Sequence, residues 1–407
     1  MPWLRSGLVV VFLASTGLAG DWPQWLGPHR DGSTSEKIRV WQKAPTRLWT
    51  ASVGEGHSSP IVADGKVFLL YKVKGQTREE LAAFDADKGT RLWATSYETN
   101  EFKSIFGNGP RGTPAFDTGK VYSLGVTGVL TCFDAKTGKI SWQVDTLKTF
   151  KAPNLVFGIS CSPLVDGDKV FVSVGKGTSI VAFDKRTGKV LWKSLSDAAS
   201  YASPIVFGKG KERQLVFLTQ QGVVSLAPDS GALFWKYRLV DLLSESSTTP
   251  VQVGNRLFAS SVTFGGVGLE LSIKDDKPQV KEAWKNKSLN CYFSTPVAVG
   301  DHLFMVTGKI FPPPPEVSLR CVDFKTGKIL WTKAKVGKYH ASLIRMGDKR
   351  LLLLDDAGNL ILLDANLKAY KELARSSICG PTWAHPAIAS GRLFIRDQKE
   401  LICLKLP

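Results

Sequence analysis

The residue types that most often carry catalysis are few in this chain and form no familiar set. The five histidines, at positions 29, 57, 302, 340 and 385, are widely spaced. The sequence contains no G-x-S-x-G, H-E-x-x-H or C-x-x-C motif and no clear pair of carboxylates. We therefore predict no catalytic residue and no metal site.

A second set of polar and aromatic residues appears when positions are counted from a recurring Ser/Thr-Pro pair. The prolines of this pair are Pro60, Pro114, Pro163, Pro204, Pro250, Pro296 and Pro386, and Leu343 fills the one slot without proline. Three residues before these anchors stand His57, Arg111, Ser160, Tyr201, Ser247, Phe293, His340 and Trp383, which we call the ring residues. The set suits a planar or anionic ligand, with Arg111 as charge clamp and Trp383 or Tyr201 as stacking surface. Alternatively, these are hydrated channel residues that bind nothing.

The ring residues are equivalent only if the chain repeats, and tryptophan positions show that it does. Tryptophan recurs at intervals of 43 to 50 residues, at Trp49, Trp93, Trp142, Trp192, Trp235, Trp284 and Trp331. Within residues 112–145, four short runs rich in β-branched and aromatic residues are separated by glycine-containing turns. Runs that are apolar on successive residues indicate small sheets covered on both faces. Four such strands at this period predict a β-propeller blade.

The two ends of the chain are predicted to share one blade. Residues 385–405 supply three strands, and the missing fourth appears around Trp49 near the N-terminus. This pairing removes an exposed sheet edge. We therefore expect an all-β fold, an eight-bladed propeller of four-stranded antiparallel blades, with residues 1–20 as signal peptide, 21–44 as N-terminal extension and 45–407 as the propeller. Blade five and blade seven, where Leu373 replaces the tryptophan region, are irregular, so seven blades is the alternative.

The repeated turn sequence explains the repeated tryptophan. Asp134 and Gly138 bracket the turn between the third and fourth strands of one unit, where glycine can adopt a positive φ. Trp142 follows on the outer strand, where its large ring can cover the seam to the next blade. We expect all seven repeat tryptophans to dock one blade against its neighbour.

The pattern A-x-D-x-x-x-G-x-x-x-W occurs at residues 83–93 and 182–192, and with Cys first at 132–142 and 321–331. It resembles the tryptophan-docking repeat of the PQQ-like quinoprotein propellers, an architecture that BamB-like proteins share. The segment WPQWLGP at residues 22–28 resembles the start of bacterial PQQ-binding-like repeat proteins. The motif implies a fold rather than an activity, because it reports blade docking.

The resemblance also implies what a dehydrogenase of this kind would need. Such enzymes hold calcium with Glu, Asn and Asp, use an Asp base and often stack the quinone on a disulfide between adjacent cysteines. This chain has no Cys-Cys pair, and its candidate ligands are only Asn108, Asn154 and Asn290. We therefore expect no cofactor, and PQQ with calcium enters only through the resemblance.

Long loops between blades mark the face where a binding site is expected. Two of them, residues 99–112 and 146–162, are much longer than the turns within a blade. Function commonly lies on loops held by a rigid scaffold. The loop residues expected to contact a ligand are Phe106, Asn108, Phe150, Asn154 and Phe157.

The N-terminal residues predict export. Arg5 precedes an apolar run at residues 8–19 that is shorter than the roughly 20 residues of a spanning helix. The following LAGD lacks the cysteine that a lipoprotein would acylate. We expect a soluble protein of the periplasm or extracellular space, not a lipoprotein, and no later transmembrane segment.

Charge and cysteine content constrain the partners. The net charge of +17 favours acidic partners, but much of the excess lies in the repeated turns and predicts a solvated rim. Cys132, Cys321 and Cys403 share a repeat position with alanines and are expected to be buried thiols, whereas the pairing of the remaining three cysteines is left open.

Three functions compete on these observations. We favour a non-enzymatic binding or protein-interaction scaffold of the cell envelope, monomeric, with a protein partner or an anionic small molecule or glycan and without nucleic acid. The alternatives are a PQQ-dependent dehydrogenase and a glycan- or polyanion-binding propeller.

Overall fold

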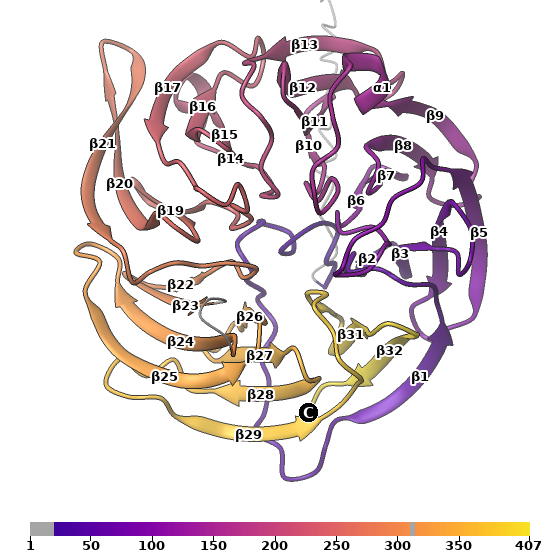
Figure 1. Cartoon of the computed structure of the whole chain (residues 1–407). Helices are drawn as coiled ribbons and strands as arrows, with labels where there is room; N and C mark the ends of the chain where they lie inside the picture. The colour runs from indigo at the N-terminus through magenta and orange to yellow at the C-terminus, as the bar shows by residue number, and fades with distance from the viewer. Residues whose placement is uncertain (1–19, 310–313) are drawn as a thin grey trace, which may run out of the picture.

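Eight sheets stand around a central axis in the computed structural model (Figure 1). The structure describes residues 20–309 and 314–407, so the predicted signal peptide lies outside the described residues except for Gly20. Each sheet has four antiparallel strands, which confirms the eight-bladed prediction over the seven-bladed alternative. A short loop helix, α1 (Thr146–Phe150), and a 3-10 turn, η1 (Gly210–Glu212), complete the elements.

The strands run outward from the axis in sequence order within each of the first seven blades. Blades one to four comprise β2 (Ile61–Ala63), β3 (Lys66–Lys72), β4 (Arg78–Asp85), β5 (Arg91–Glu98); β6 (Ala115–Asp117), β7 (Lys120–Leu124), β8 (Val129–Asp134), β9 (Ile140–Asp145); β10 (Leu164–Asp166), β11 (Lys169–Gly175), β12 (Thr178–Asp184), β13 (Val190–Ser194); and β14 (Ile205–Phe207), β15 (Gln214–Thr219), β16 (Gly222–Leu226), β17 (Leu233–Arg238). Blades five to eight comprise β18 (Val251–Val253), β19 (Arg256–Ser261), β20 (Gly265–Lys274), β21 (Lys277–Asn286); β22 (Val297–Val299), β23 (His302–Lys309), β24 (Glu316–Asp323), β25 (Ile329–Gly337); β26 (Ala341–Arg345), β27 (Leu351–Asp355), β28 (Asn359–Leu363), β29 (Glu372–Ser377); and β30 (Ala387–Ala389), β31 (Arg392–Arg396), β32 (Glu400–Lys405) with β1 (Thr46–Ser52).

The eighth blade joins the two ends of the chain, as the sequence predicts. Strand β1 pairs antiparallel with β32, and Trp49 stands opposite Cys403. The same pairing of a tryptophan with a small residue recurs in other blades, for example between Trp142 and Cys132. The N-terminal strand therefore closes the ring and leaves no unpaired end blade.

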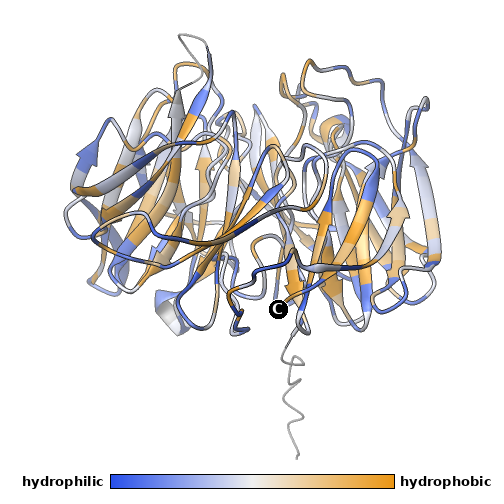
Figure 2. Cartoon of the chain, turned by 90° about the horizontal axis from the view of Figure 1, so that it is seen from below, coloured by the Kyte–Doolittle hydropathy of each residue, from blue (hydrophilic) through white to orange (hydrophobic). Residues whose placement is uncertain are grey.

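The hydrophobic core is divided among the seams between blades. The middle strands are buried on both faces, as in β3 and β8, and Figure 2 shows apolar residues along the strands with hydrophilic residues at the turns. Separate clusters of buried side chains join neighbouring blades, such as Phe68 and Phe133 across the first seam. Consecutive apolar residues are required because each sheet packs against two neighbours.

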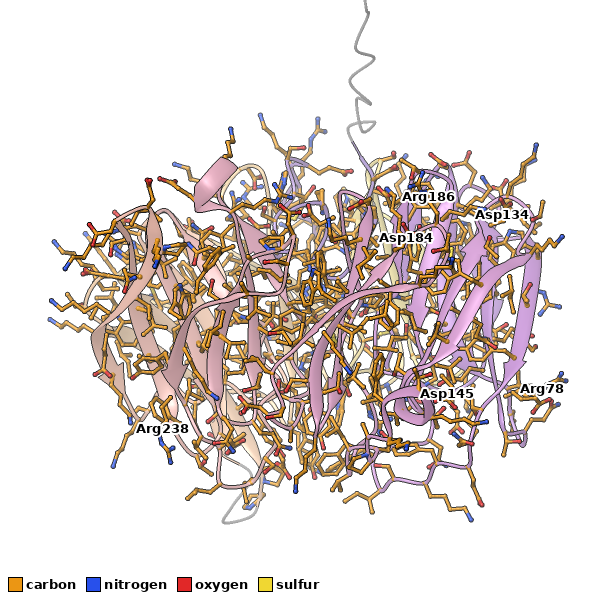
Figure 3. The ribbon with its side chains drawn as sticks, turned by 90° about the horizontal axis from the view of Figure 1, so that it is seen from above. Arg78, Asp134, Asp145, Asp184, Arg186 and Arg238 are labelled. Carbon is orange, nitrogen blue, oxygen red and sulfur yellow. The ribbon has the colours of Figure 1, made fainter. Side chains whose placement is uncertain are left out.

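The two faces of the disc differ in their connections. Asp134, Asp184 and Arg186, in turns between third and fourth strands, lie on one face, whereas Arg78, Asp145 and Arg238 lie on the other (Figure 3). We call the first the turn face. The opposite face carries the connections between blades, and we call it the loop face.

Six repeat tryptophans hydrogen-bond across a seam to the turn of the next blade. The indole N–H groups of Trp49, Trp93, Trp142, Trp192, Trp284 and Trp331 donate to Ala86, Ala135, Lys185, Pro228, Phe324 and Asn366 carbonyls at 2.9–3.2 Å. The turn glycine lies directly under the ring, so that a Cβ on Gly138 would come within 2.6 Å of Trp93. Glycine is therefore required at this motif position for two reasons: the backbone has a positive φ, and the tryptophan ring of the neighbouring blade lies too close for a side chain.

Trp235 departs from this pattern. Its indole N–H donates to Gln214 Oε1 in its own blade, although the ring still packs with residues of blade five. The cause lies in blade five, where Asp275 and Asp276 join β20 to β21 in a tight hairpin that lacks the motif glycine. No equivalent turn carbonyl is offered to the indole.

Blade seven also differs from the expectation. Ala374, not Leu373, occupies the tryptophan position, because it pairs with Leu362 at the register break where tryptophan stands in other blades. Trp41 of the N-terminal segment donates its indole N–H to Ser376 of β29 and joins the apolar cluster at this seam. A residue from outside the repeats therefore supplies the missing ring.

Residues 21–44, predicted to be an N-terminal extension, pack against the propeller near its axis through several buried side chains. Figure 1 shows the segment crossing the middle of the disc. Trp22 pairs with Val62 of blade one, and the buried Arg30 donates to the carbonyls of Ser162, Pro163 and Pro204 in blades three and four. This segment fills the axial channel from the turn face.

All six cysteines are free thiols, and five of them are buried. Within the described ranges, no helix has both the length and the apolar character needed to cross a membrane.

Candidate functional site

All eight ring residues line one pocket on the axis. The pocket has a volume of about 130 Å³ and also takes in Phe106 and Phe157 from the two long loops. Each ring residue precedes the innermost strand of its blade, as His57 precedes β2 and His340 precedes β26. The eightfold repeat brings these residues together, because equivalent positions in a closed propeller face the same axis.

Arg111 positions the loop that carries Phe106. Its two terminal nitrogens donate to the carbonyls of Gly107 and Gly109 at 2.9 Å, and its guanidinium lies over the Phe102 ring. Arg111 therefore holds the tip of this loop closed.

Phe106 is the centre of an aromatic cluster at the mouth of the pocket. Its ring centroid lies 5.3 Å from that of Trp383, 5.5 Å from Phe157 and 6.4 Å from both Phe293 and Tyr339. Trp383 also stacks on Phe293 at 5.1 Å. These contacts make a largely apolar wall from residues far apart in sequence.

Two histidines that line the pocket, the half-buried His57 and the buried His340, are neutral at pH 7. Burial lowers the pKa of both His57 and His340 to about 4. His57 Nε2 lies 2.7 Å from the Phe106 carbonyl, which only accepts, so Nε2 carries the proton. The remaining nitrogen, Nδ1, is buried without a hydrogen-bond partner.

His340 also has a fixed tautomer that leaves one ring nitrogen without a hydrogen-bond partner, but a different contact fixes it. The Ser294 hydroxyl donates to the Ala341 carbonyl at 2.8 Å, so its oxygen accepts from His340 Nδ1 at 3.1 Å. His340 Nε2 is left with a lone pair and no partner. Two residues that line the pocket therefore each hold a buried ring nitrogen whose lone pair has no partner among the described residues.

Two arginines place positive charge near the pocket, where Glu55, Glu79 and Asp397 offset it in part without forming ion pairs with them. Burial lowers the pKa of Arg111 and of the fully buried Arg396 to about 10, and both guanidiniums raise the positive potential at His57. Neither arginine forms a salt bridge with another described residue. The side of the pocket nearest Arg111 therefore favours negative charge on a ligand, whereas the side formed by Glu245 does not.

Sequence reasoning missed Trp25 and Glu245, which also line the pocket. Trp25 closes the floor and donates its indole N–H to Thr249 at 2.9 Å. Glu245 precedes the ring residue Ser247 by two positions and accepts a hydrogen bond from the Tyr292 hydroxyl. Burial raises its pKa. Proximity to Ser247 was the sequence signal for Glu245, and Trp25 lies in the WPQWLGP segment, which indicated a family resemblance but not a place in the pocket.

Three of the expected loop contacts lie away from the pocket. Phe150 ends helix α1 and packs edge-on against Phe183, because Asp145 caps a helix where a loop was expected. Asn108 accepts from the Ser104 N–H, and Asn154 binds the Val126 carbonyl beside a neighbouring groove. The loop fold uses these side chains internally.

The donors around the pocket do not fit calcium-bound PQQ. Calcium takes six to eight oxygen ligands, most often several carboxylates. Among the described residues that line this pocket, Glu245 is the single carboxylate, and Asn108, Asn154 and Asn290 do not line it. The side-chain oxygens of Asn108 and Asn154 accept from backbone N–H groups. No chemical step through that cofactor follows from these residues.

Comparison with known proteins places the chain among propellers of one family. A family model described as outer membrane protein assembly factor BamB matches residues 77–333. BamB of Yersinia pestis is 23% identical over 295 residues, which cover 68% of each chain. The crystal structure of BamB from Moraxella catarrhalis has a TM-score of 0.61 at 16% identity and covers 89% of this chain and 98% of that chain. Quinohemoprotein alcohol dehydrogenase from Comamonas testosteroni has a TM-score of 0.67 at 14% identity, covering 96% and 81%. These structural likenesses show the fold alone.

Proposed function

The chain belongs to the outer membrane protein assembly factor BamB family, and we propose that it is a non-enzymatic protein-interaction scaffold of the cell envelope. The relative from Yersinia pestis is named as an assembly factor for outer membrane proteins, so the proposed partner is a component of that assembly. A closed propeller supports this function, because it offers loops on a rigid frame.

The loop face carries the proposed binding surface. Four large aliphatic side chains are strongly exposed on its loops: Ile105 at 88%, Val156 at 79%, Leu242 at 84% and Leu243 at 49%. We call these four residues the apolar rim. Val156 and Leu243 line one groove, of about 240 Å³, that adjoins the central pocket through Phe157, Tyr201 and Glu245. Grouped apolar side chains of this kind mark interaction sites.

The experiment compares a rim variant with a variant matched for lost hydrophobicity. We expect Val156→Asp with Leu243→Asp to abolish cross-linking of the protein to an outer-membrane assembly component in the envelope fraction. The control is Leu92→Asp with Leu191→Asp, at exposed positions of β5 and β13 on the outer wall. Its cross-linking should equal that of the wild type. Equal loss in both variants, or in neither, would contradict a binding surface at the rim.

Export is part of the proposal and has its own test. Deletion of residues 2–20 should retain the protein in the cytosol, whereas the full chain should be recovered with periplasmic markers. Full recovery of the deleted chain outside the cytosol would contradict a signal function for this segment.

A PQQ-dependent dehydrogenase is the second candidate, supported by the fold shared with the alcohol dehydrogenase. Two measurements distinguish the scaffold from the dehydrogenase. The protein is titrated with PQQ and calcium while quinone binding is followed by absorbance, and reduction of a dye is then assayed with alcohols as substrates. On the scaffold proposal, we expect no saturable quinone binding.

A further inference from the structure

Three residues that line the central pocket carry hydrogen-bond acceptors, and two of these acceptors have no partner among the described residues. His57 and His340 each have a buried ring nitrogen with a free lone pair, and the Glu245 carboxylate lines the same pocket. A buried acceptor without a partner costs stability that a donor from a ligand would recover. The pocket therefore selects a molecule that carries several O–H or N–H groups.

These acceptors are distributed around the axis. Successive blades are rotated by about 45° in an eight-bladed ring. His57 precedes blade one, Glu245 lies in the loop before blade five and His340 precedes blade seven. The three acceptors therefore lie on different sides of the pocket, and a matching ligand must direct its donors outward in several directions.

Two donor groups stand two blades apart on the wall and interact electrostatically. Arg111, before blade two, uses only two of its five N–H groups on loop carbonyls. Tyr201, before blade four, accepts from the Phe157 N–H at 3.2 Å, which leaves its own hydroxyl hydrogen for another acceptor. A guanidinium and a phenol hydroxyl that line one small pocket are suited to the two oxygens of a carboxylate.

The remaining walls and floor are aromatic. Phe106, Phe157, Phe293 and Trp383 surround the opening, and Trp25 closes the bottom. Aromatic faces pack well against the C–H groups of a saturated ring. The volume of about 130 Å³ leaves room for one such ring with its substituents, not for a chain of rings.

From these features we propose that the pocket binds a hydroxylated ring acid, chemically a sugar acid. Its carboxylate is held by Arg111 and Tyr201, and its hydroxyl groups donate to His57, His340 and Glu245. The Glu245 charge opposes an anion on its own side of the pocket, so the acid group lies toward Arg111. The proposal is independent of the scaffold function, since it uses the pocket and not the apolar rim.

Binding of three probes to the whole mature chain tests the proposal by calorimetry. Glucuronate has the ring, hydroxyls and carboxylate; glucose lacks the carboxylate; and cyclohexanecarboxylate lacks the hydroxyls. We expect saturable binding of glucuronate, with each of the other probes bound about tenfold more weakly. Equal affinities for the three probes, or no binding of glucuronate, would overturn the proposal.

Two variants assign the contacts. Tyr201→Phe removes one hydrogen-bond donor to the carboxylate. It should lower the affinity for glucuronate about fivefold and leave the affinity for glucose unchanged. His340→Asn retains a side-chain donor toward Ser294 and has no acceptor at the position of Nε2, so it should weaken binding of both sugars but not of cyclohexanecarboxylate. Leu92→Asp on the outer wall is the control and should bind as the wild type does. A uniform change across all probes in either variant, or none, would contradict these contacts.

The same chemistry can come from a free sugar acid or from the end of an acidic glycan. A digalacturonate and a tetragalacturonate, compared with galacturonate, distinguish these sources. Tighter binding with length indicates a chain end, and equal binding indicates the free acid. If galacturonate, digalacturonate, tetragalacturonate and glucuronate all fail to bind, the proposal is overturned, and the result of the rim experiment is unaffected.

Discussion

At the scale of single residues, the pocket histidines show how burial sets protonation. Both imidazoles are enclosed by aromatic and aliphatic groups, so the charged form loses its hydration and the neutral form is favoured. His340 is 5% exposed, and burial is the largest cause of its lowered pKa. The fixed tautomers follow from single contacts to carbonyl and hydroxyl oxygens. Neutral acceptors, rather than cations, are therefore present at pH 7.

This protonation predicts a loss of stability in mild acid. The pKa of each ring falls from 6.5 to about 4 on folding, so the unfolded chain binds the proton first. The stability present above about pH 6.5 should be lost as the pH falls toward 4, by up to about 3 kcal/mol for each ring. Urea unfolding at pH 7 and pH 5 measures the change, and His340→Asn should show a smaller loss than the wild type. An identical pH dependence in both proteins would contradict this explanation.

At the scale of elements, each blade joint depends on a tryptophan and a turn glycine from different blades. The ring of Trp93 lies on Gly138, and its N–H reaches the Ala135 carbonyl of the same turn. Trp235 differs, because the hairpin of blade five has no such turn. Its indole N–H donates instead to Gln214 in its own blade. The docking bond is therefore a property of the receiving blade as much as of the tryptophan.

Two glycines of blade two separate the effect of φ from that of close packing. Gly119 and Gly138 both have φ of 75°, but only Gly138 faces the Trp93 ring. Gly119→Ala should cost about 1 kcal/mol of unfolding free energy from backbone strain. Gly138→Ala should cost about 2 kcal/mol more, because the added methyl displaces the ring. Chemical denaturation measures both, and equal losses would show that the seam tolerates the methyl group.

At the scale of the whole molecule, the N-terminal segment closes the axial channel of the propeller at one end. Arg30 and Trp25 reach across the axis to blades three, four and five, and Trp41 completes the seam between blades seven and eight. The pocket consequently opens at the loop face and is floored from the turn face. A segment outside the repeats thus defines the depth of the site.

Removal of this segment should leave the blades intact but weaken the ring. A chain that starts at residue 37 keeps β1 and Trp41 and loses the buried Trp22 and Leu26. We expect a loss of about 4 kcal/mol in unfolding free energy from these two side chains, with an unchanged β-sheet circular dichroism spectrum. A chain that starts at residue 20 is the control. Equal stability of the two chains would contradict a role for the segment in holding the ring closed.

The sequence by itself determined the blade count, the closure by β1 and the register of the ring residues. These depend on short-range periodicity, since each blade repeats the same strand pattern and symmetry carries like positions to one axis. The tertiary structure alone decided the positions of Trp25 and Glu245, the α1 helix at Phe150 and the exception at Trp235. Those features depend on loop conformation and on contacts between segments far apart in the chain, which no repeat period specifies.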